Sequence, residues 1–555
     1  MSTFNINATD ANGNTLTGTL TLTPPAPPPP PPPTGNTVTV TVVDAAGVVW
    51  TANATVGTDW TIASPWIPLQ DPNGNAHPGI GAFIYSDCCD VGVFSGAADN
   101  DYAGTLSVAY NGTAVFGPQA VQFYRGCLNQ TLRYGPQAPW NPVDPTLFPN
   151  WAKGTFPLWD MTKYDLSYNG MGVATYKGMG GTGSRGDIAY VPEWDVGFCV
   201  NPSDASFACV RTAADHAGAW PIYFGDPTTG LPYDITNYPN TTLLPPAAEI
   251  FPGNPIVPYQ GNLKTWKTSG SPLSPDEAHE TGYCFVAAAA TGTARDQFHA
   301  AVWANYALTA LNPTYRQADG IWQHYQERGS GWALRSIFLA AYVSSMPGYF
   351  SNQLSVMLAK VPPSNPFGFL ADYCRSGFNG PNSGIAYWEE NYDRIVVNVI
   401  AKKLPAWQPF NVYLAQAVVT ALTGNTYPLS TLYVHTVKDS AGNFLPDWPT
   451  ILLDSLQSTE CGSWPLADAQ AATAPGATLQ TIYNLMVAHG FTGQLGDLAQ
   501  YDKAPDDYPA LMRAAVASAV DAGVPGASAA WTLMQSLPTQ PVWGNEWGFN
   551  VIPRS

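Results

Sequence analysis

The chain has 555 residues, of which 45% are hydrophobic and only 11% are charged. This length predicts about two to four domains with a sizeable core, and the 51 glycines and 52 prolines predict long ordered loops. The 40 acidic side chains outnumber the 22 basic ones and give a net charge of −18, which repels phosphate backbones and argues against a nucleic-acid partner.

No run of apolar residues is long enough to span a bilayer, so we expect no membrane insertion. The N-terminus, MSTFNINATD, lacks the basic and apolar regions of a secretory signal. The composition, with 19 Trp, 28 Tyr and few Lys, is nevertheless typical of proteins that work outside cells. We therefore expect an extracellular or virion-associated protein, either released with a virion by lysis or shortened by removal of its signal.

The first 35 residues predict an attachment segment. Residues 1–23 alternate in character around a turn at residues 10–13, which predicts a β-hairpin. Residues 24–35 are mostly proline and predict a stiff polyproline linker. This arrangement resembles the attachment segments of phage tail fibre proteins, and the resemblance implies assembly into a virion or a homo-oligomer through the N-terminus.

The next two regions differ in their patterns. Residues 36–135 form short alternating segments separated by Gly, Asn and Asp, and they predict an antiparallel β-sandwich. Residues 136–271 are rich in Gly, Pro and Trp with little periodicity, and we expect them to be draped on the helical domain that follows. Within them, Cys199 and Cys209 bracket a short polar loop and could close a disulfide, or remain free buried thiols.

A glycine-rich stretch, residues 178–195 (GMGGTGSRGDIAYVPEWD), formally contains GxGxxG. No amphipathic helix is predicted after it, so a dinucleotide site is not expected. Its glycines allow sharp turns that would deliver four side chains to a cleft, namely Arg185, Asp187, Glu193 and Trp194. The alternative is a structural loop held by a contact between Arg185 and Asp187, with Trp194 buried.

Residues 272–555 predict an all-helical domain. Its first helix begins with a capping box at Ser274 and Glu277 and ends at Gly292. Further helical patterns cover residues 296–311, about 327–343, 349–361, 385–404, 407–423, 479–489, 508–522 and 527–536. Helical hairpins in series can close into an α/α toroid whose inner helix ends frame a cleft.

We therefore predict an α+β multidomain fold, in which an antiparallel β-sandwich precedes an α/α toroid of helical hairpins. An open helical repeat is the alternative, although no fixed period is visible.

Three polar residues are predicted close to the start of the first helix. Asp276, His279 and Tyr283 fall at i, i+3 and i+7, so on a continuous helix they would share one face. Unpaired N–H donors at a helix start favour polar or anionic ligands. An acid, an imidazole and a phenol in this arrangement indicate a functional site, and the alternative is a capped surface helix end with a solvated histidine.

Short motifs at the predicted helix starts carry a family resemblance: DEAH at 276–279, WALR at 332–335 and WEENY at 388–392. With a β-sandwich and a toroid, they resemble carbohydrate-active proteins of the toroid polysaccharide lyase and six-hairpin glycosidase types. The resemblance covers about residues 270–540. It implies a polysaccharide bound in a cleft of the toroid and cleavage of its glycosidic bonds.

Two reactions fit the residues available. A glycoside hydrolase needs two carboxyl groups, and the candidates include Asp276, Glu280, Glu389 and Glu390. A lyase needs a base, such as His279 or Tyr283, and a group that neutralises a uronate, such as Arg328, Arg335 or Asn391. The aromatic residues that could stack on sugars, or belong to the core, are Trp194, Trp332, Trp388 and Tyr392.

The acidic net charge slightly favours a neutral substrate and hydrolysis over β-elimination. Motifs typical of zinc proteases, serine hydrolases and nucleotide-binding loops are absent from the sequence, and we expect neither a metal nor another cofactor. The competing hypothesis is a non-catalytic glycan-binding adhesin or tail-fibre structural protein of a virion. A cleft with two carboxyls or a base–arginine pair would favour the enzyme, whereas a filled toroid centre would favour the adhesin.

Overall fold

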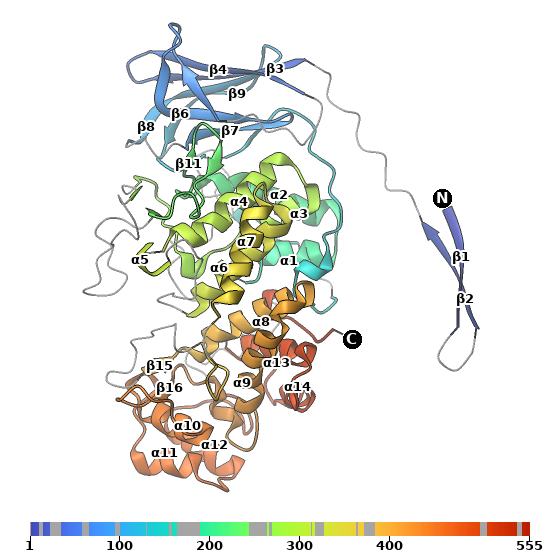
Figure 1. Cartoon of the computed structure of the whole chain (residues 1–555), viewed down its shortest axis with the longest axis vertical. Coiled ribbons are helices and arrows are strands. Elements are labelled where there is room, and N and C mark those ends of the chain that lie inside the picture. The colour runs from blue at the N-terminus through green and yellow to red at the C-terminus, as the bar shows by residue number, and fades with distance from the viewer. Residues whose placement is uncertain are drawn as a thin grey trace.

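The computed structural model describes residues 2–9, 15–22, 35–57, 66–94, 100–128, 130–154, 158–163, 189–243, 264–265, 269–311, 313–316, 327–361, 364–370, 383–499, 508–540 and 547–554. Figure 1 shows an antiparallel sheet at one end of the molecule and a stack of helices extending away from it. The α+β class, with a β region ahead of a helical region, is therefore confirmed. Among the described residues, no helix is long and apolar enough to cross a bilayer.

The N-terminal hairpin is confirmed. Strands β1 (Ser2–Thr9) and β2 (Thr15–Leu22) pair antiparallel, with Ser2 opposite Leu22. The polyproline run of the predicted linker lies outside the described residues.

The large sheet contains eight strands: β3 (Asn36–Asp44), β4 (Val49–Val56), β5 (Ile67–Gln70), β6 (Ala76–Ile84), β7 (Cys88–Val93), β8 (Tyr102–Tyr110), β9 (Thr113–Phe123) and β10 (Leu132–Arg133). They are hydrogen-bonded in the order β10-β7-β6-β5-β4-β3-β8-β9, and all neighbours are antiparallel. The predicted sandwich of two sheets is therefore replaced by one continuous sheet.

A single sheet can bury a hydrophobic core without a second sheet because it curls around that core. Val38, Val40 and Val42 on β3 are fully buried, and they belong to one hydrophobic cluster with residues of β4 to β10. Register shifts between β5 and β6 and between β8 and β9 mark irregular points in the ladder, where bulges bend strands. The alternation seen in the sequence therefore predicted correctly which side chains of β3 are buried.

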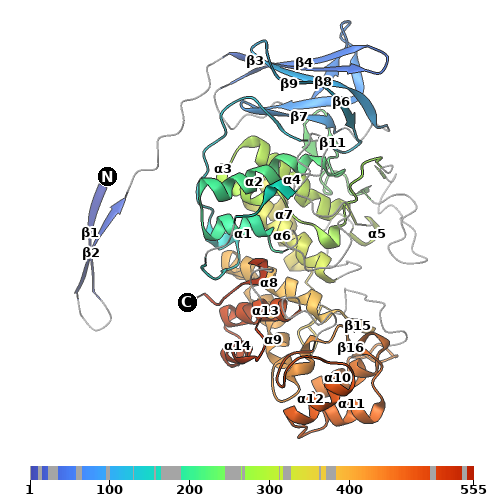
Figure 2. The ribbon, with the colours of Figure 1, turned by 180° about the vertical axis from the view of Figure 1, so that it is seen from behind.

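The helices are α1 (Glu193–Val200), α2 (Asp204–His216), α3 (Phe285–Thr291), α4 (Ala294–Thr309), α5 (Pro313–Arg316), α6 (Glu327–Val343), α7 (Pro347–Ala359), α8 (Tyr387–Lys403), α9 (Gln408–Ala421), α10 (Trp448–Gln457), α11 (Leu466–Thr473), α12 (Leu479–Ala488), α13 (Tyr508–Ala522) and α14 (Ala527–Ser536). Figures 1 and 2 show α2 to α4 next to the sheet, α1 farther from it, and α10 to α12 at the far end. The helical patterns at 296–311, 327–343 and 508–522 are confirmed, whereas α10 and α11 were not predicted.

Short pairs of strands complete the structure: β11 (Gly225–Asp226) with β12 (Leu231–Pro232), β13 (Thr241–Thr242) with β14 (Lys264–Thr265), and β15 (Ser383–Ile385) with β16 (His435–Lys438).

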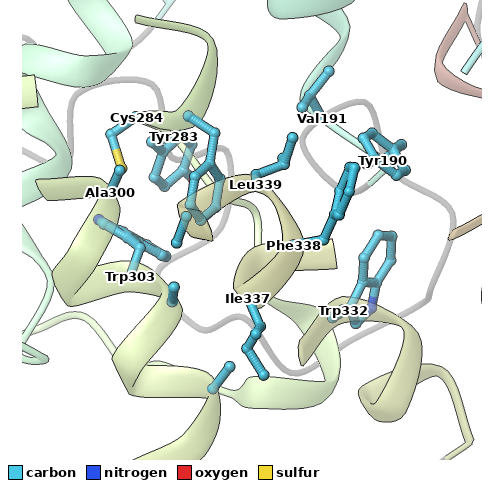
Figure 3. Close-up of a cluster of buried hydrophobic side chains, with 14 of the residues drawn as sticks. Tyr190, Val191, Tyr283, Cys284, Ala300, Trp303, Trp332, Ile337, Phe338 and Leu339 are labelled. Atoms are coloured by element: carbon cyan, nitrogen blue, oxygen red, sulfur yellow. The ribbon is translucent and has the colours of Figure 1, made fainter. Parts of the chain in front are cut away.

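The centre of the helical region is densely packed around α6 and α8. Trp332, Ile337, Phe338 and Leu339 on α6 are all fully buried, and Figure 3 shows them pointing to different sides of the helix. Helix α8 is buried continuously from Tyr387 to Ala401, and it packs against both α6 and α13. A helix that is buried on every side is a core helix, so these two helices fill the interior.

The predicted first helix is wrong as one continuous element. Residues Glu277–His279 form a short 3₁₀ turn, and α3 begins only at Phe285. Gly282 between them has φ of 71°, which favours glycine, and a β-carbon there would come within 3.0 Å of the Phe285 ring. Asp276, not Ser274, caps the turn, because its side chain accepts from the Ala278 N–H at 2.8 Å.

The glycine-rich stretch is described only from residue 189 onward, so Arg185 and Asp187 lie outside the described residues. Helix α1 begins at Glu193, inside this stretch, and it is mostly buried rather than amphipathic. The suggested disulfide between Cys199 and Cys209 is not formed, and all seven cysteines in the described part of the chain are free.

Candidate functional site

A polar cluster lies where the 276–280 segment meets the starts of α6 and α8. His279 Nδ1 is 3.1 Å from Asp276 Oδ2, and its Nε2 contacts the Arg328 guanidinium. Arg328 Nη1 is 3.4 Å from Glu389 Oε1, and Arg328 Nε donates to the Ala278 carbonyl oxygen at 3.1 Å. The structure thus brings together four predicted site residues, Asp276, His279, Arg328 and Glu389, which we call the His279 cluster.

These contacts define the tautomer of His279. Arginine in a protein is always protonated and has only donors, so Nε2 of His279 must accept from Arg328. The ring proton then lies on Nδ1 and is donated to the Asp276 carboxylate. A histidine held in this way by a carboxylate has its lone pair on Nε2, as a general base requires.

The His279 cluster is mostly buried. His279, Arg328 and Glu389 are 3%, 4% and 3% exposed, whereas the Asp276 side chain is 22% exposed. The cluster therefore reaches the surface at Asp276.

An aromatic wall adjoins the arginine. The Arg328 guanidinium carbon is 5.1 Å from the centre of the Trp388 ring. Trp388 is stacked on Tyr508 at 4.7 Å and on Tyr433 at 6.3 Å. Trp388 and Tyr508 are only 5% and 7% exposed and belong to the hydrophobic core, so this wall supports the arginine from inside the fold.

Glu280 belongs to a separate group. Its Oε1 accepts from Ser336 Oγ at 2.8 Å and lies 3.8 Å from Arg335 Nη2. Burial raises the pKa of Glu280 to about 7, although Arg335 opposes the shift. Arg335 also donates to the carbonyl oxygens of Ala189 and Tyr190, at 3.1 and 3.2 Å, so it ties the end of the glycine-rich stretch to α6.

Glu390 is held in another buried pair. Arg394 Nη2 is 2.7 Å from Glu390 Oε2, and the Leu370 N–H donates to Oε1 at 2.8 Å. Burial raises the pKa of Glu390 to about 7. Asn391 accepts from the same arginine at 2.8 Å. Glu390 and Asn391 therefore lie with Arg394 and not in the His279 cluster.

The other predicted aromatic residues lie in the core. The rings of Trp194 and Tyr283 are parallel, with centroids 5.9 Å apart, and both residues are 2% exposed. Trp332 is fully buried between Arg335 and Tyr392, at 4.9 and 4.2 Å. The contact between Trp194 and Tyr283 joins the described end of the glycine-rich stretch to the 276–283 segment within the core.

The predicted substrate-binding residue Glu193 is buried at 3% exposure, and two acidic residues that were not predicted, Asp195 and Asp393, are 0% and 1% exposed. Asp195 and Asp393 have no hydrogen-bond partner on other described residues, and burial raises the pKa of each well above the usual range. Burial therefore favours the protonated form of both carboxyls, since an unpaired buried carboxylate is unstable. Asp393 follows Glu389 by four residues on α8, a spacing that could have drawn attention to it in the sequence.

The arrangement is suited to acid–base chemistry. Within the described ranges, no group of three or more His, Cys, Asp or Glu side chains could hold a metal ion. The His279 cluster contains a base oriented by a carboxylate and an adjacent guanidinium, next to an aromatic wall. No family model, curated protein or solved structure matches the chain.

Proposed function

We propose that this chain is a carbohydrate-active protein of extracellular or virion-associated location that cleaves glycosidic bonds of a polysaccharide at the His279 cluster. The contact chain from Asp276 through His279 to Arg328 supports this proposal most directly. The finer fold prediction belongs to the same proposal: helices arranged as an α/α toroid would bring helix starts together around a cleft, and the starts of α6 and α8 meet at this cluster.

The geometry favours β-elimination over hydrolysis. Elimination needs a base that removes the proton next to a uronate carboxylate and a cation that neutralises that carboxylate. His279 and Arg328 supply these groups in direct contact. Hydrolysis needs two available carboxyls, whereas Glu280 and Glu390 are engaged in separate buried groups.

Hydrolysis is the alternative reaction. The net charge of −18 favours it, because a neutral polysaccharide is not repelled by an acidic protein. Asp276 and Glu389 both adjoin the His279–Arg328 contact and would serve as the two carboxyls.

A non-catalytic glycan-binding protein, such as a virion adhesin or a structural protein of a tail fibre, is the second candidate function. The burial of His279, Arg328 and Glu389 to below 5% exposure favours it. In that case the cluster would support the fold, and a glycan would bind elsewhere on the surface.

The test is a panel of neutral and uronate-containing polysaccharides, assayed for new reducing ends and for the absorbance of unsaturated uronates. We expect both signals from the native chain and neither from His279→Gln. The matched control is His489→Gln, because His489 also pairs with an aspartate, Asp468, at 3.0 Å but lies outside the His279 cluster. Reducing ends without absorbance would establish hydrolysis, and binding without any product would establish the adhesin.

A further inference from the structure

A second buried polar network joins the curled sheet to the helical region. It includes four carboxyl groups, three guanidinium groups and one imidazole, contributed by Asp87, Asp90, Arg133, Arg211, Asp215, Arg295, Asp296 and His299. Asp87, Asp90 and Arg133 come from the sheet or its turns, and the others come from α2 and α4. Figure 2 shows α2 and α4 next to β7.

Arg133 forms one link across the boundary. Its Nη1 lies 2.7 Å from Asp87 Oδ2, and its Nη2 lies 2.6 Å from Asp215 Oδ1. Arg133 and Asp215 side chains are 18% and 13% exposed, so this link is the outer rim of the network.

Arg295 forms the inner link. Its Nη1 is 2.8 Å from Asp296 Oδ1, and its Nη2 donates to Thr131 Oγ1 in the sheet region and to the Ala214 carbonyl oxygen at the end of α2. Arg211 completes the network with two contacts of 2.7 Å to Asp296.

The guanidinium groups of the network all face aspartate carboxylates, including Arg211 Nε at 2.9 Å from Asp215 and Arg295 Nε at 3.6 Å from Asp90, although neither Nε forms a hydrogen bond within the described residues. The small cavity beside it, lined by Asp87, Cys88, Arg133, Arg211 and Arg295 among others, has a free volume of about 10 Å³. This space suits about one water molecule. Because each of the three guanidinium groups already contacts aspartate carboxylates, none of them is available for an added anion.

His299 occupies the innermost position. It is fully buried, its Nδ1 is 2.5 Å from the Tyr223 hydroxyl, and its Nε2 is 3.0 Å from Asp90 Oδ2. The neutral ring donates from Nε2 to the Asp90 carboxylate and accepts the Tyr223 proton at Nδ1. A second ring proton would occupy Nδ1, leave the Tyr223 O–H without its acceptor and place a positive charge near Arg295, and each change costs free energy in a buried site.

We propose that this network is an acid-sensitive latch, which holds the sheet on α2 and α4 at neutral pH and releases the sheet from the helices when His299 takes up a proton from solvent. The sheet encloses a core of its own that would survive release, whereas Trp66, Phe83 and Phe94 pack with the helices and would be exposed. The apolar part of the same boundary includes the contact of Phe83 with Phe298 at 4.5 Å between ring centroids.

The direction of the pH dependence follows from the groups around His299, which are Asp90 on β7, Tyr223 before β11, and Arg295 and Asp296 on α4. Burial, with a contribution from Arg295, lowers the pKa of His299 below the ordinary histidine value. The released state therefore binds a proton more readily than the latched state, and acid favours release. For one such group, the release equilibrium rises by up to about tenfold per pH unit below the ordinary histidine pKa.

Hydrogen exchange on the full chain tests the latch between about pH 7.5 and about pH 5.5, where histidines titrate. After correction for intrinsic exchange rates, we expect protection of β7 and the start of α4 to fall on acidification while α9 and α13 stay protected. His299→Gln cannot take up the proton, so the acid-induced loss should disappear. The control is His435→Gln, because His435 is also fully buried but lies on β16, far from the network, and the loss should persist in it.

A second variant covers the case in which His299→Gln does not fold. Arg133→Gln removes the partly exposed outer link and should lower the protection of β7 already at neutral pH. Unchanged protection in Arg133→Gln, or an acid-induced loss that persists in His299→Gln, would overturn the latch.

Discussion

His279 and His299 are both buried histidines that contact a carboxylate, yet their surroundings differ. His299 has a tyrosine on one ring nitrogen and an aspartate on the other, and it is fully enclosed. His279 has an aspartate on Nδ1 and an arginine on Nε2, and its aspartate reaches the surface. The acceptor nitrogen is engaged in both rings, by the Tyr223 hydroxyl in His299 and by Arg328 in His279. Under the proposed function, a substrate carboxylate would compete for Arg328 and free Nε2 of His279.

This comparison predicts that the enclosed network around His299 contributes more to the free energy of unfolding than the His279 cluster does. Arg295→Met removes one partner from several buried carboxylates, and the free energy of unfolding should fall by about 3–5 kcal/mol. Urea denaturation measures the change. Lys403→Met is the control, because the 2.7 Å pair of Lys403 with Asp144 is partly exposed, at 28% and 44%, and should be worth about 1 kcal/mol or less. Equal losses of unfolding free energy in Arg295→Met and Lys403→Met would contradict this prediction.

The second prediction concerns the pH dependence of stability near the His279 cluster. The pKa of Glu280 is raised to about 7 by burial, so between about pH 4.5 and 7 the folded chain keeps a proton that the unfolded chain loses. The contribution of protonated Glu280 to the free energy of unfolding therefore falls as pH rises, by up to about 1.4 kcal/mol per pH unit.

Glu280→Gln should remove that part of the slope, which denaturant titrations at several pH values would show. Glu390→Gln is a matched comparison, since burial also raises the pKa of Glu390 to about 7. A slope that is the same in Glu280→Gln as in the native chain would mean that Glu280 is ionised in the fold.

Gly282→Ala is expected to have a smaller effect. The left-handed backbone at φ of 71° and the approach of a β-carbon to Phe285 at 3.0 Å should together cost about 1–2 kcal/mol. Gly442→Ala is the control, because it has φ of 84° but no atom within 4 Å of an added β-carbon. A larger loss in Gly442→Ala than in Gly282→Ala would refute the role of the contact, as judged by thermal unfolding.

The smallest effect on stability is expected for Asp276→Asn. The Asp276 side chain is 22% exposed, and loss of its charge should lower the free energy of unfolding by about 0.5–1.5 kcal/mol. If His279 is the base, the same change should slow polysaccharide cleavage by about 10²–10⁴-fold. A folded Asp276→Asn chain with the native cleavage rate would remove the carboxylate from the mechanism.

Local patterns in the sequence predicted local structure well. The 3.6-residue periodicity predicted α4, α6, α8 and α13, and Asp276 and His279, three residues apart, do contact each other. The continuous first helix failed at Gly282, because the close approach of Arg335 and Phe285 to that glycine depends on tertiary packing.

Contacts between distant parts of the chain could not be predicted from these patterns. Arg328 is 49 residues from His279, and Asp90 is 209 residues from His299. Nothing in the local spacing of either pair indicates that they meet. The His279 cluster was therefore predicted in its members but not in its geometry, and the boundary network was not predicted at all.

The β9 strand is the last in the described sheet order and exposes most of its residues. At its middle, Pro118 has no backbone N–H, and Gly117 bends the strand with φ of 73°. A strand from another molecule that approached this edge would find an interrupted row of donors. The sheet should consequently resist edge-to-edge polymerisation, even where many copies of the chain are crowded together.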